Sequence, residues 1–540
     1  MPSTHPLLKP TGIIVLSILA FLLPIAFIEY SVLQDTHGTL AYPIDDTFIH
    51  LAIAKNIALY YNWGINAHDF VSASSSIIYP VILATAVKIA GPVAVIPLLV
   101  NISAGVALII VVQRWLQRQA VLPTAQLLIL LAMIILTPLP VLAIAGMEHV
   151  LQILFCFLFL TSFAGDLERG LASGQPKWQL SWKVYLYGAL FTATRYEAIP
   201  MIGFAAIGLL LCRRYLSAVQ LVLYSLLPIF LFGIFSLYHG NYFFPNSVLL
   251  KSGMPPMTMD GLIDFFTDTL YIKLSYSIVG YNTIATQRIL LLLPLSYLVF
   301  IRQMKPGSAY RSMLLILTAS VLLHLSITGY AHFPRYEAYL IGVSSLVLGV
   351  VLAKYTGKVW TSQRSAFQYI AVFTLILLVF PVFMRSKTAF GEMRQACVNI
   401  FEQQYQMGQF LHQYYYNEKA AIGDIGAVSY LTAGNIIDLV GLANINIARS
   451  RREHYNSPDF LDYLTKKEAV KIAVVYDVFN YPALLSRWNK IATWKIPNNV
   501  ACGDDIVSFY AVDQSAGPLL KSNLLAFQPL LPKEVVVKYY

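Results

Sequence analysis

The stretch Tyr42-Pro-Ile-Asp-Asp-Thr-Phe-Ile-His50 places two adjacent carboxylates just beyond the first long apolar run of the chain, Gly12 to Ile28. Two neighbouring carboxylates at a membrane surface repel each other and lose hydration, so such a pair usually has a function. Apolar side chains in residues 46–61 have the spacing of a short amphipathic helix lying on the membrane. Asp45 and Asp46 stand at its start, where the helix dipole favours negative charge. A helix cap needs only one carboxylate, so the pair favours a reactive site over a cap.

The composition identifies the class of protein. Of the 540 residues, 57% are hydrophobic and only 12% are charged, about half the charged share that is typical of soluble domains. This composition predicts a polytopic α-helical membrane protein. The net charge of +10 comes from Lys and Arg in short loops between apolar runs, as membrane orientation requires. There is no basic stripe with interleaved aromatics, which argues against nucleic acid as a partner.

About eleven transmembrane helices are predicted from the apolar runs, at 12–29, 92–112, 121–137, 149–165, 183–196, 198–212, 216–237, 286–301, 312–328, 338–354 and 367–384. Five Arg/Lys-bearing breaks between them fall on one side of the membrane if the segment 74–90 lies at the interface. The positive-inside rule makes that side cytoplasmic, with the N terminus inside and the C terminus outside. If 77–90 crossed the membrane, the downstream charges would lie on the wrong side.

The outward loops carry polar side chains at helix ends, and both functional and structural interpretations of them are open. Arg195 and Glu197 pair with each other in the simplest interpretation, and Arg335 can be a snorkelling residue. However, an amide, an ammonium and a guanidinium beside a lipid headgroup also suit a phosphate ligand. The candidates are Glu148, His149, Arg195, Glu197, Asn246, Lys251, Arg335 and Tyr336.

Together these motifs resemble one family. Ile44-Asp-Asp-Thr-Phe-Ile-His50, Ala54-Lys-Asn-Ile-Ala58 and the stretch 66–76 are similar to the first loop of the GT-C glycosyltransferases. The later pieces follow in the order of that family: Gly146-Met-Glu148, Thr194-Arg-Tyr-Glu197, Pro245-Asn-Ser247 with Lys251, and Arg335-Tyr336. The most similar branch is the AftB-like group, terminal arabinofuranosyltransferases that use a polyprenyl-phosphate sugar. Thr47 replaces the family's usual alanine, and Tyr196 replaces the proline of an Arg-Pro-Glu pattern, so the sugar stays open.

The resemblance implies a multi-pass enzyme of the bacterial inner membrane, with its active site and C-terminal domain facing the periplasm. It implies transfer of a sugar from polyprenyl phosphate to a glycan, lipid or pilin-type protein acceptor. The donor already carries a good leaving group, so the protein must supply a base and neutralise the departing phosphate. We expect Asp45 to be the general base of an inverting transfer, and Asp46 to orient it or hold a divalent cation (Mg, Mn or Ca). The expected phosphate ligands are Lys251, Arg335, Asn246 and Arg195, and the expected sugar or acceptor contacts are Glu148, His149, Glu197 and Tyr336.

Two other functions stay open as alternatives. An envelope polysaccharide polymerase would use a lipid-linked oligosaccharide as donor instead of a monosaccharide. A secondary transporter would need charges and broken helices near the membrane midplane, whereas the polar groups here cluster at outward helix ends.

Residues 387–540 are predicted to form an extracytoplasmic α/β domain after a transmembrane module of residues 1–386. The long apolar runs stop there, an amphipathic helix is expected over 394–416, and a strand, a glycine turn and a helix over 420–430. Further strands are expected at 435–441, 470–476, 491–496 and 506–512. Gly423-Asp-Ile-Gly426 lacks the spacing of a phosphate loop and is interpreted as a tight turn. The resemblance implies acceptor binding by this domain, and an oxidising periplasm would allow a disulfide between Cys397 and Cys502.

Overall fold

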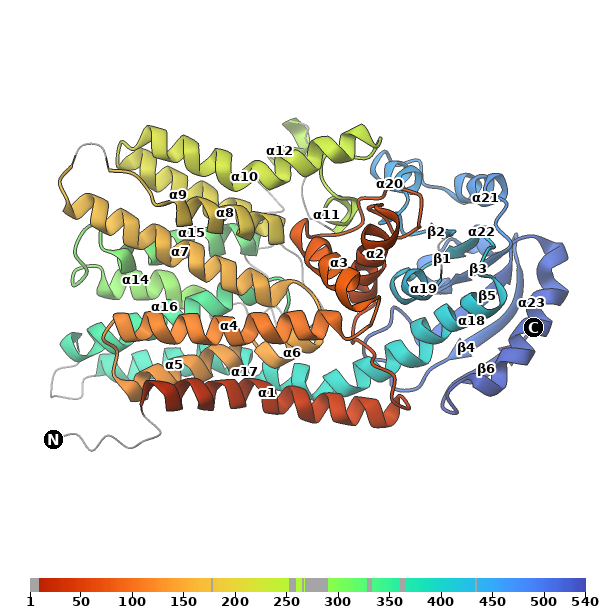
Figure 1. Ribbon diagram of the computed structural model, residues 1–540, viewed down its shortest axis with the longest axis horizontal. Coiled ribbons are helices and arrows are strands. Elements are labelled where there is room, and N and C mark those ends of the chain that lie inside the picture. Colours follow the sequence, from red (N-terminus) through yellow and green to blue (C-terminus); the bar gives the residue numbers. More distant parts are fainter. Residues whose placement is uncertain are drawn as a thin grey trace.

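The protein consists of a bundle of apolar helices at one end and an α/β domain at the other (Figure 1). The computed structural model describes residues 9–175, 178–251, 259–264, 267, 290–327, 333–359, 366–432 and 435–540. Two helices of the first outward loop, α2 (Asp46–Tyr60) and α3 (Ile78–Ala90), lie where the bundle meets the α/β domain. The first outward loop therefore forms part of the junction between the two parts.

Each of the eleven predicted spans overlaps a helix of the bundle. These helices are α1 (Pro10–Asp35), α4 (Ile96–Arg118), α5 (Pro123–Leu136), α7 (His149–Ala172), α8 (Trp182–Thr194), α9 (Ile199–Leu211), α10 (Tyr215–Tyr238), α14 (Leu292–Phe300), α15 (Ala309–Ile327), α16 (Ala338–Val359) and α17 (Ala366–Ile400). Residues 286–289 and 328 of the predicted spans lie outside the described residues. Within the described part of the chain, five helices are long and apolar enough to cross a membrane. The chain is therefore a multi-pass membrane protein, and eleven crossings stay a prediction.

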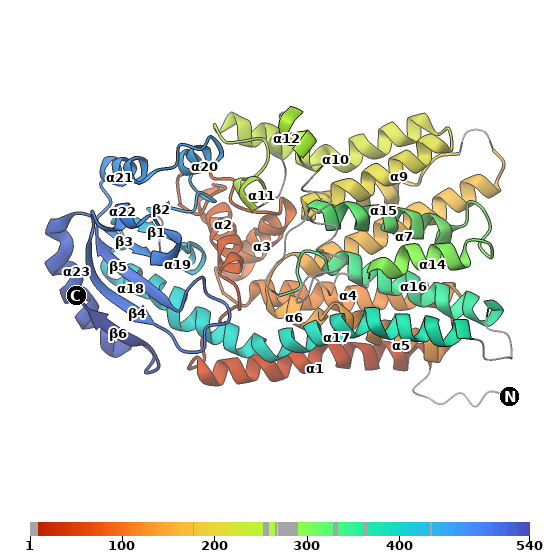
Figure 2. The same cartoon turned by 180° about the vertical axis from the view of Figure 1, so that it is seen from behind.

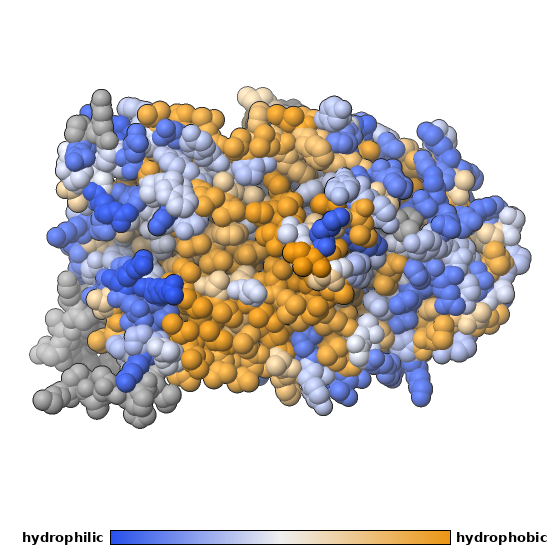
Figure 3. Space-filling view, in the orientation of Figure 1, coloured by the Kyte–Doolittle hydropathy of each residue, from blue (hydrophilic) through white to orange (hydrophobic). Residues whose placement is uncertain are grey.

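An apolar band covers the helix bundle on the face seen in Figure 3. In Figure 3 the hydrophobic surface covers the middle of the molecule, between a hydrophilic end formed by helix-connecting loops and the hydrophilic α/β domain. α3 packs along α2, the other helix of the first outward loop, which favours the predicted interfacial position of this segment.

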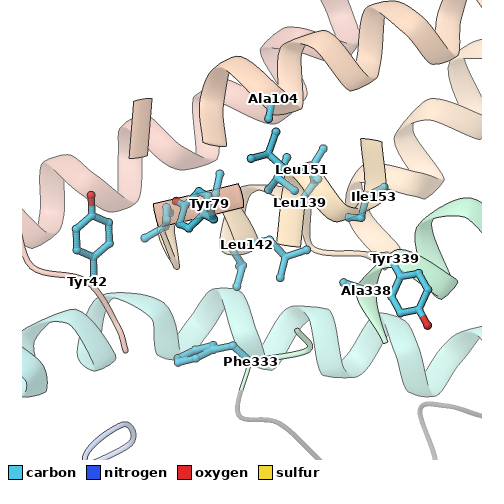
Figure 4. Close-up of a cluster of buried hydrophobic side chains, with 14 of the residues drawn as sticks. Tyr42, Tyr79, Ala104, Leu139, Leu142, Leu151, Ile153, Phe333, Ala338 and Tyr339 are labelled. Atoms are coloured by element: carbon cyan, nitrogen blue, oxygen red, sulfur yellow. The ribbon is translucent and has the colours of Figure 1, made fainter. Parts of the chain in front are cut away.

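Buried aromatic side chains fix the first outward loop on the bundle (Figure 4). The Tyr42 hydroxyl donates a hydrogen bond to the Ala94 carbonyl at 2.6 Å, and the Tyr79 hydroxyl donates to the Gly146 carbonyl at 2.6 Å. Both tyrosine rings are buried with the apolar side chains of the short helix α6 (Leu139–Ile144), which the sequence did not predict. The loop that carries the Asp pair is thus anchored by packing and by hydrogen bonds at the end of the bundle.

The α/β domain contains one mixed sheet of six strands in the order β2-β1-β3-β5-β4-β6. β1 is parallel to β2 and β3, whereas β5 is antiparallel to β3 and β4, and β6 is antiparallel to β4. The strands are β1 (Ala420–Ile422), β2 (Ile436–Asp438), β3 (Ile472–Val475), β4 (Asn489–Lys495), β5 (Ile506–Ala511) and β6 (Val536–Tyr539). The first five were predicted, and β6 was not.

Six helices accompany the sheet, and one of them continues the membrane bundle. α17 passes through the predicted domain boundary at residues 386 and 387 and runs on through a π-helical segment, Phe401–Tyr405, into α18 (Gln406–Tyr414) (Figure 2). The others are α19 (Gly426–Leu431), α20 (Ile445–Arg452), α21 (Pro458–Lys467), α22 (Pro482–Leu485) and α23 (Gly517–Phe527). A continuous helical segment therefore joins the helix bundle to the α/β domain.

The predicted disulfide between Cys397 and Cys502 is wrong, because both side chains are buried as free thiols. Cys397 lies within α17, and burial raises the pKa of the Cys502 thiol. The Cys502 sulfur makes its contact with Gln404, at 3.1 Å from the amide oxygen. Each cysteine is therefore a small packing residue here.

Candidate active site

Asp45 joins the helix bundle to the α/β domain. Its carboxylate accepts hydrogen bonds from the backbone N–H groups of Gly426 at 2.6 Å and Ala427 at 2.8 Å, in the first turn of α19. The side chain makes no capping bond to its own helix, α2. The simple interpretation of the Asp pair as the cap of α2 is therefore wrong for Asp45, which instead bonds a helix 381 positions away.

The proton affinity of Asp45 is increased by its surroundings. Burial is the largest cause and the nearby Asp424 carboxylate is the next, and together they raise the pKa of Asp45 to about 8. The two backbone donors act in the opposite direction, because they stabilise the charged form. A carboxylate whose pKa lies near the operating pH is suited to accept a proton in catalysis.

Lys55 holds the other end of α19 and was not among the predicted site residues. Its ammonium donates to the carbonyl oxygens of Tyr430 at 2.6 Å and Thr432 at 3.0 Å, at the C-terminal end of α19. Because Asp45 contacts the start of α19 and Lys55 its end, α2 and α19 run in the same direction. Each charge also has the sign that the helix dipole of α19 favours. Burial of the Lys55 side chain lowers the pKa of its ammonium group to about 8.

Asp46 is paired with Arg335, which comes from the segment just before α16. The guanidinium Nη1 lies 3.2 Å from the Asp46 carboxylate oxygen, with side chains 9% and 24% exposed, respectively. The ring of Tyr336 lies between two guanidinium groups, 5.3 Å from that of Arg195 and 5.8 Å from that of Arg335. The structure thus brings Asp46 of the predicted catalytic pair together with Arg335, a predicted phosphate ligand.

A second cluster of charges surrounds Arg195, with Arg195 and Glu148 buried and Glu197 partly exposed. Arg195 donates two hydrogen bonds to Glu197, at 3.0 and 2.6 Å, and one to Glu148 at 2.7 Å. Glu148 also accepts from the Ser75 hydroxyl at 3.1 Å and lies 3.3 Å from the His50 ring nitrogen. The simplest interpretation of Arg195 and Glu197, that they pair with each other, is therefore confirmed. These contacts occupy both sides of the Arg195 guanidinium.

The other predicted site residues lie around these two clusters. The backbone N–H of Asn246 donates to the Ser72 carbonyl at 2.9 Å, and its side-chain amide donates to the Leu442 carbonyl at 3.3 Å. Asn246 therefore contacts both the first loop and the α/β domain. Lys251 is the last residue of α11 (Asn246–Lys251), and its side chain lies outside the described part of the structure. His149 is buried at the start of α7, with Nδ1 3.4 Å from the Gln152 amide oxygen.

The turn Gly423-Asp-Ile-Gly426 lies against Asp45, which the sequence did not predict. The turn itself was predicted correctly, since it connects β1 to α19. A Cβ atom on Gly426 would lie 2.0 Å from the Asp45 carbonyl oxygen, so only glycine permits this approach. Gly426 is visible in the sequence as a turn residue. Its partner Asp45 is too far away along the chain for a local pattern to indicate the contact.

No metal site is evident in the residues that the structure describes, because no three His, Cys, Asp or Glu side chains lie close enough together to hold an ion. Asp46, the predicted cation ligand, faces the Arg335 guanidinium, and a divalent cation at Asp46 stays a prediction.

Comparison with known proteins identifies the architecture. Two crystal structures of ArnT from Cupriavidus metallidurans match almost the whole chain. The structure bound to undecaprenyl phosphate has 13% sequence identity and a TM-score of 0.51, and the match covers 92% of this chain and 98% of that one. The apo structure has 12% identity and a TM-score of 0.51, with 94% and 98% covered. The chain shares the fold of ArnT. At this identity the likeness establishes the fold alone.

The α/β domain has a separate match. A family model described as a domain of unknown function, DUF8728, matches residues 398–510, which run from the end of α17 through most of β5. No curated protein matches the sequence. Asp424 and Gly426 lie within the stretch that this model matches.

Proposed function

We propose that this protein is a membrane glycosyltransferase of the GT-C type that moves a sugar from a polyprenyl-phosphate donor to an acceptor hydroxyl outside the cytoplasm. The observation that carries the proposal is the Asp45–Asp46 pair with Arg335, held at the end of a helix bundle that has the ArnT fold. ArnT itself has been crystallised with undecaprenyl phosphate. A base and a guanidinium side by side are the two groups that transfer from a lipid phosphate requires.

The reaction follows from these groups. Asp45 removes the proton from the acceptor hydroxyl, whose oxygen attacks the anomeric carbon from the face opposite the phosphate. The bond between the anomeric carbon and the phosphate oxygen breaks, and the polyprenyl phosphate leaves with both electrons of that bond. The configuration at the anomeric carbon is therefore inverted. Arg335 binds the departing phosphate by charge-assisted hydrogen bonds, joined by Lys251 and Asn246. Asp46 keeps the Arg335 guanidinium in place between donor phosphate and base.

The buried cluster contributes orientation in this proposal. Arg195 is engaged by Glu148 and Glu197, so we assign it to fixing these carboxylates instead of binding phosphate directly. Glu148, Glu197 and His149 then shape the wall of the sugar site, and Tyr336 offers a ring to the sugar or acceptor. Arabinofuranose is the proposed sugar, with the bacterial inner membrane as the location and a periplasm-facing site.

The test is a transfer assay with the purified full-length protein, a radiolabelled polyprenyl-phosphate sugar and an envelope glycan acceptor. Transfer by Asp45→Asn is expected to fall by about 10²–10⁴-fold, the usual contribution of a general base. Asp69→Asn is the matched control, because Asp69 is an exposed aspartate of the same loop. Near-normal transfer by folded Asp45→Asn protein would contradict the assignment of the base. Transfer from a lipid-linked oligosaccharide but from no lipid-linked monosaccharide would contradict the proposed donor and indicate a polymerase.

A further inference from the structure

The carboxyl ends of the parallel strands in the α/β domain face the first outward loop. β1 lies between β2 and β3, and the chain leaves β1 on one side through α19 to β2 and returns on the other side to β3. In open α/β sheets, ligands bind at such a point, outside the carboxyl ends of the strands. The turn after β1 and Tyr476 after β3 lie at this edge, and Asp45 is bonded to the same edge through Gly426.

Asp424 is held at this edge by two hydrogen bonds to one of its oxygens. Oδ2 accepts from the Tyr476 hydroxyl at 2.7 Å and from the Gln404 amide at 2.8 Å. The same Tyr476 hydroxyl lies 2.7 Å from the Gln403 amide oxygen, and both glutamine side chains are fully buried. The single Tyr476 proton serves one of these two acceptors, whereas the Gln404 amide donates to Asp424. The domain thus fixes the position of the Asp424 carboxyl group at the end of β1.

The two glutamines come from the π-helical segment Phe401–Tyr405. A π-helical insertion in an α-helix has an energetic cost and occurs most often at functional sites. Here the insertion places consecutive glutamines, Gln403 and Gln404, at the same hydroxyl, that of Tyr476. The local departure from α-helix therefore serves the network that holds Asp424.

The surroundings of Asp45 consist of one carboxylate from each side of the junction. Asp46 lies on its own helix and is paired with Arg335. From the α/β domain, the ionisable groups that act on Asp45 are the carboxylate of Asp424, the hydroxyl of Tyr476 and the thiol of Cys502. Asp424 is the carboxyl group of this set, and burial raises the pKa values of the Tyr476 hydroxyl and the Cys502 thiol.

We propose that the α/β domain completes the active site: the turn after β1 holds the Asp45 carboxylate through the N–H groups of Gly426 and Ala427, with Asp424 of the same turn as a positioning residue for Asp45. The inference rests on the proposed function, and it gives the C-terminal domain a direct part in the chemistry. The α19 backbone fixes the direction of the Asp45 carboxylate, and the Asp424 charge, fixed by Gln404 and Tyr476, favours the protonated form. Removal of the Asp424 charge therefore lowers the pH at which Asp45 becomes an active base.

The experiment is the pH profile of transfer for the full-length protein and its Asp424→Asn variant, which keeps the shape of the side chain. Wild-type activity is expected to rise with pH through about 8, as Asp45 loses its proton. In Asp424→Asn this rise is expected about one pH unit lower, with a reduced plateau because the base is weaker. Asp477→Asn is the matched control: Asp477 follows β3 in the same domain but pairs with Lys490, and its profile should not shift. A uniform loss of activity with an unshifted profile, or no change, would overturn the proposal.

A second measurement separates this inference from the proposed function. Infrared spectroscopy of the purified protein follows the protonated carboxyl band that disappears in Asp45→Asn, and this needs no substrate. If that band titrates at lower pH in Asp424→Asn while no lipid-linked sugar is transferred, the coupling stands and the proposed function fails. If the protein transfers sugar but the band does not move, the proposed function stands and the coupling is wrong.

Discussion

The two clusters of charged residues at the junction differ in the groups that hold their carboxylates. In the buried cluster, Arg195 binds two carboxylates, with the side chains of Glu148 and Glu197 0% and 24% exposed. In the other cluster, the Arg335 guanidinium lies 3.2 Å from the Asp46 carboxylate, and Asp45 is held by backbone N–H groups of α19. Two carboxylates paired with one guanidinium inside the bundle maintain the structure, whereas a carboxylate held by backbone N–H groups at the junction can exchange these partners for a substrate. The difference assigns stability to the first cluster and chemistry to the second.

Breaking the buried cluster should cost stability. Glu148→Ala leaves the Arg195 guanidinium buried with one partner fewer, and removal of one member of a buried ion pair costs about 3–5 kcal/mol. We expect a large fall in the thermal unfolding temperature of the detergent-purified protein. Glu168→Ala is the control, because Glu168 is exposed near the opposite end of α7. Unchanged unfolding with lost activity would mean that Glu148 belongs to the reactive cluster instead.

Breaking the contact between the first loop and the α/β domain should affect activity more than stability. In Gly426→Ala the new Cβ atom would lie 2.0 Å from the Asp45 carbonyl oxygen, so the turn must move away from Asp45. Overpacking of this kind costs about 1–3 kcal/mol, and transfer should fall because Asp45 loses its two backbone donors. The control is Gly423→Ala in the same turn, where the nearest atom to a Cβ is 3.8 Å away. Equal transfer rates for the two variants would show that this contact has no part in the reaction.

Much of the fold could be predicted from local sequence patterns, since apolar runs marked the helices of the bundle and short apolar stretches marked β1 to β5. α6 and β6 could not be predicted, because α6 has only six residues and β6 is a short edge strand with partly exposed side chains. Asp46 and Arg335 were both named as site residues from the sequence, but their contact was not predicted. The contact of Asp45 with Gly426 was not predicted because the two residues are far apart in the sequence and meet only in the folded protein. Lys55 was not predicted as a site residue because its ammonium bonds carbonyl groups of another domain.

The substitution with the smallest expected effect, that of Arg335, tests which cluster contacts the donor. Arg335→Lys keeps the positive charge beside Asp46 but loses the planar fork that binds two phosphate oxygens. We expect kcat/KM for the polyprenyl-phosphate sugar to fall about tenfold, equivalent to ~1.4 kcal/mol, with little change in the unfolding temperature. Arg394→Lys is the control, since Arg394 pairs with Asp35 at the surface of the junction. The measurement is the transfer rate as a function of donor concentration, together with the unfolding temperature. A lowered unfolding temperature with unchanged kcat/KM would make Arg335 a structural partner of Asp46. The contrast between the two clusters would then fail.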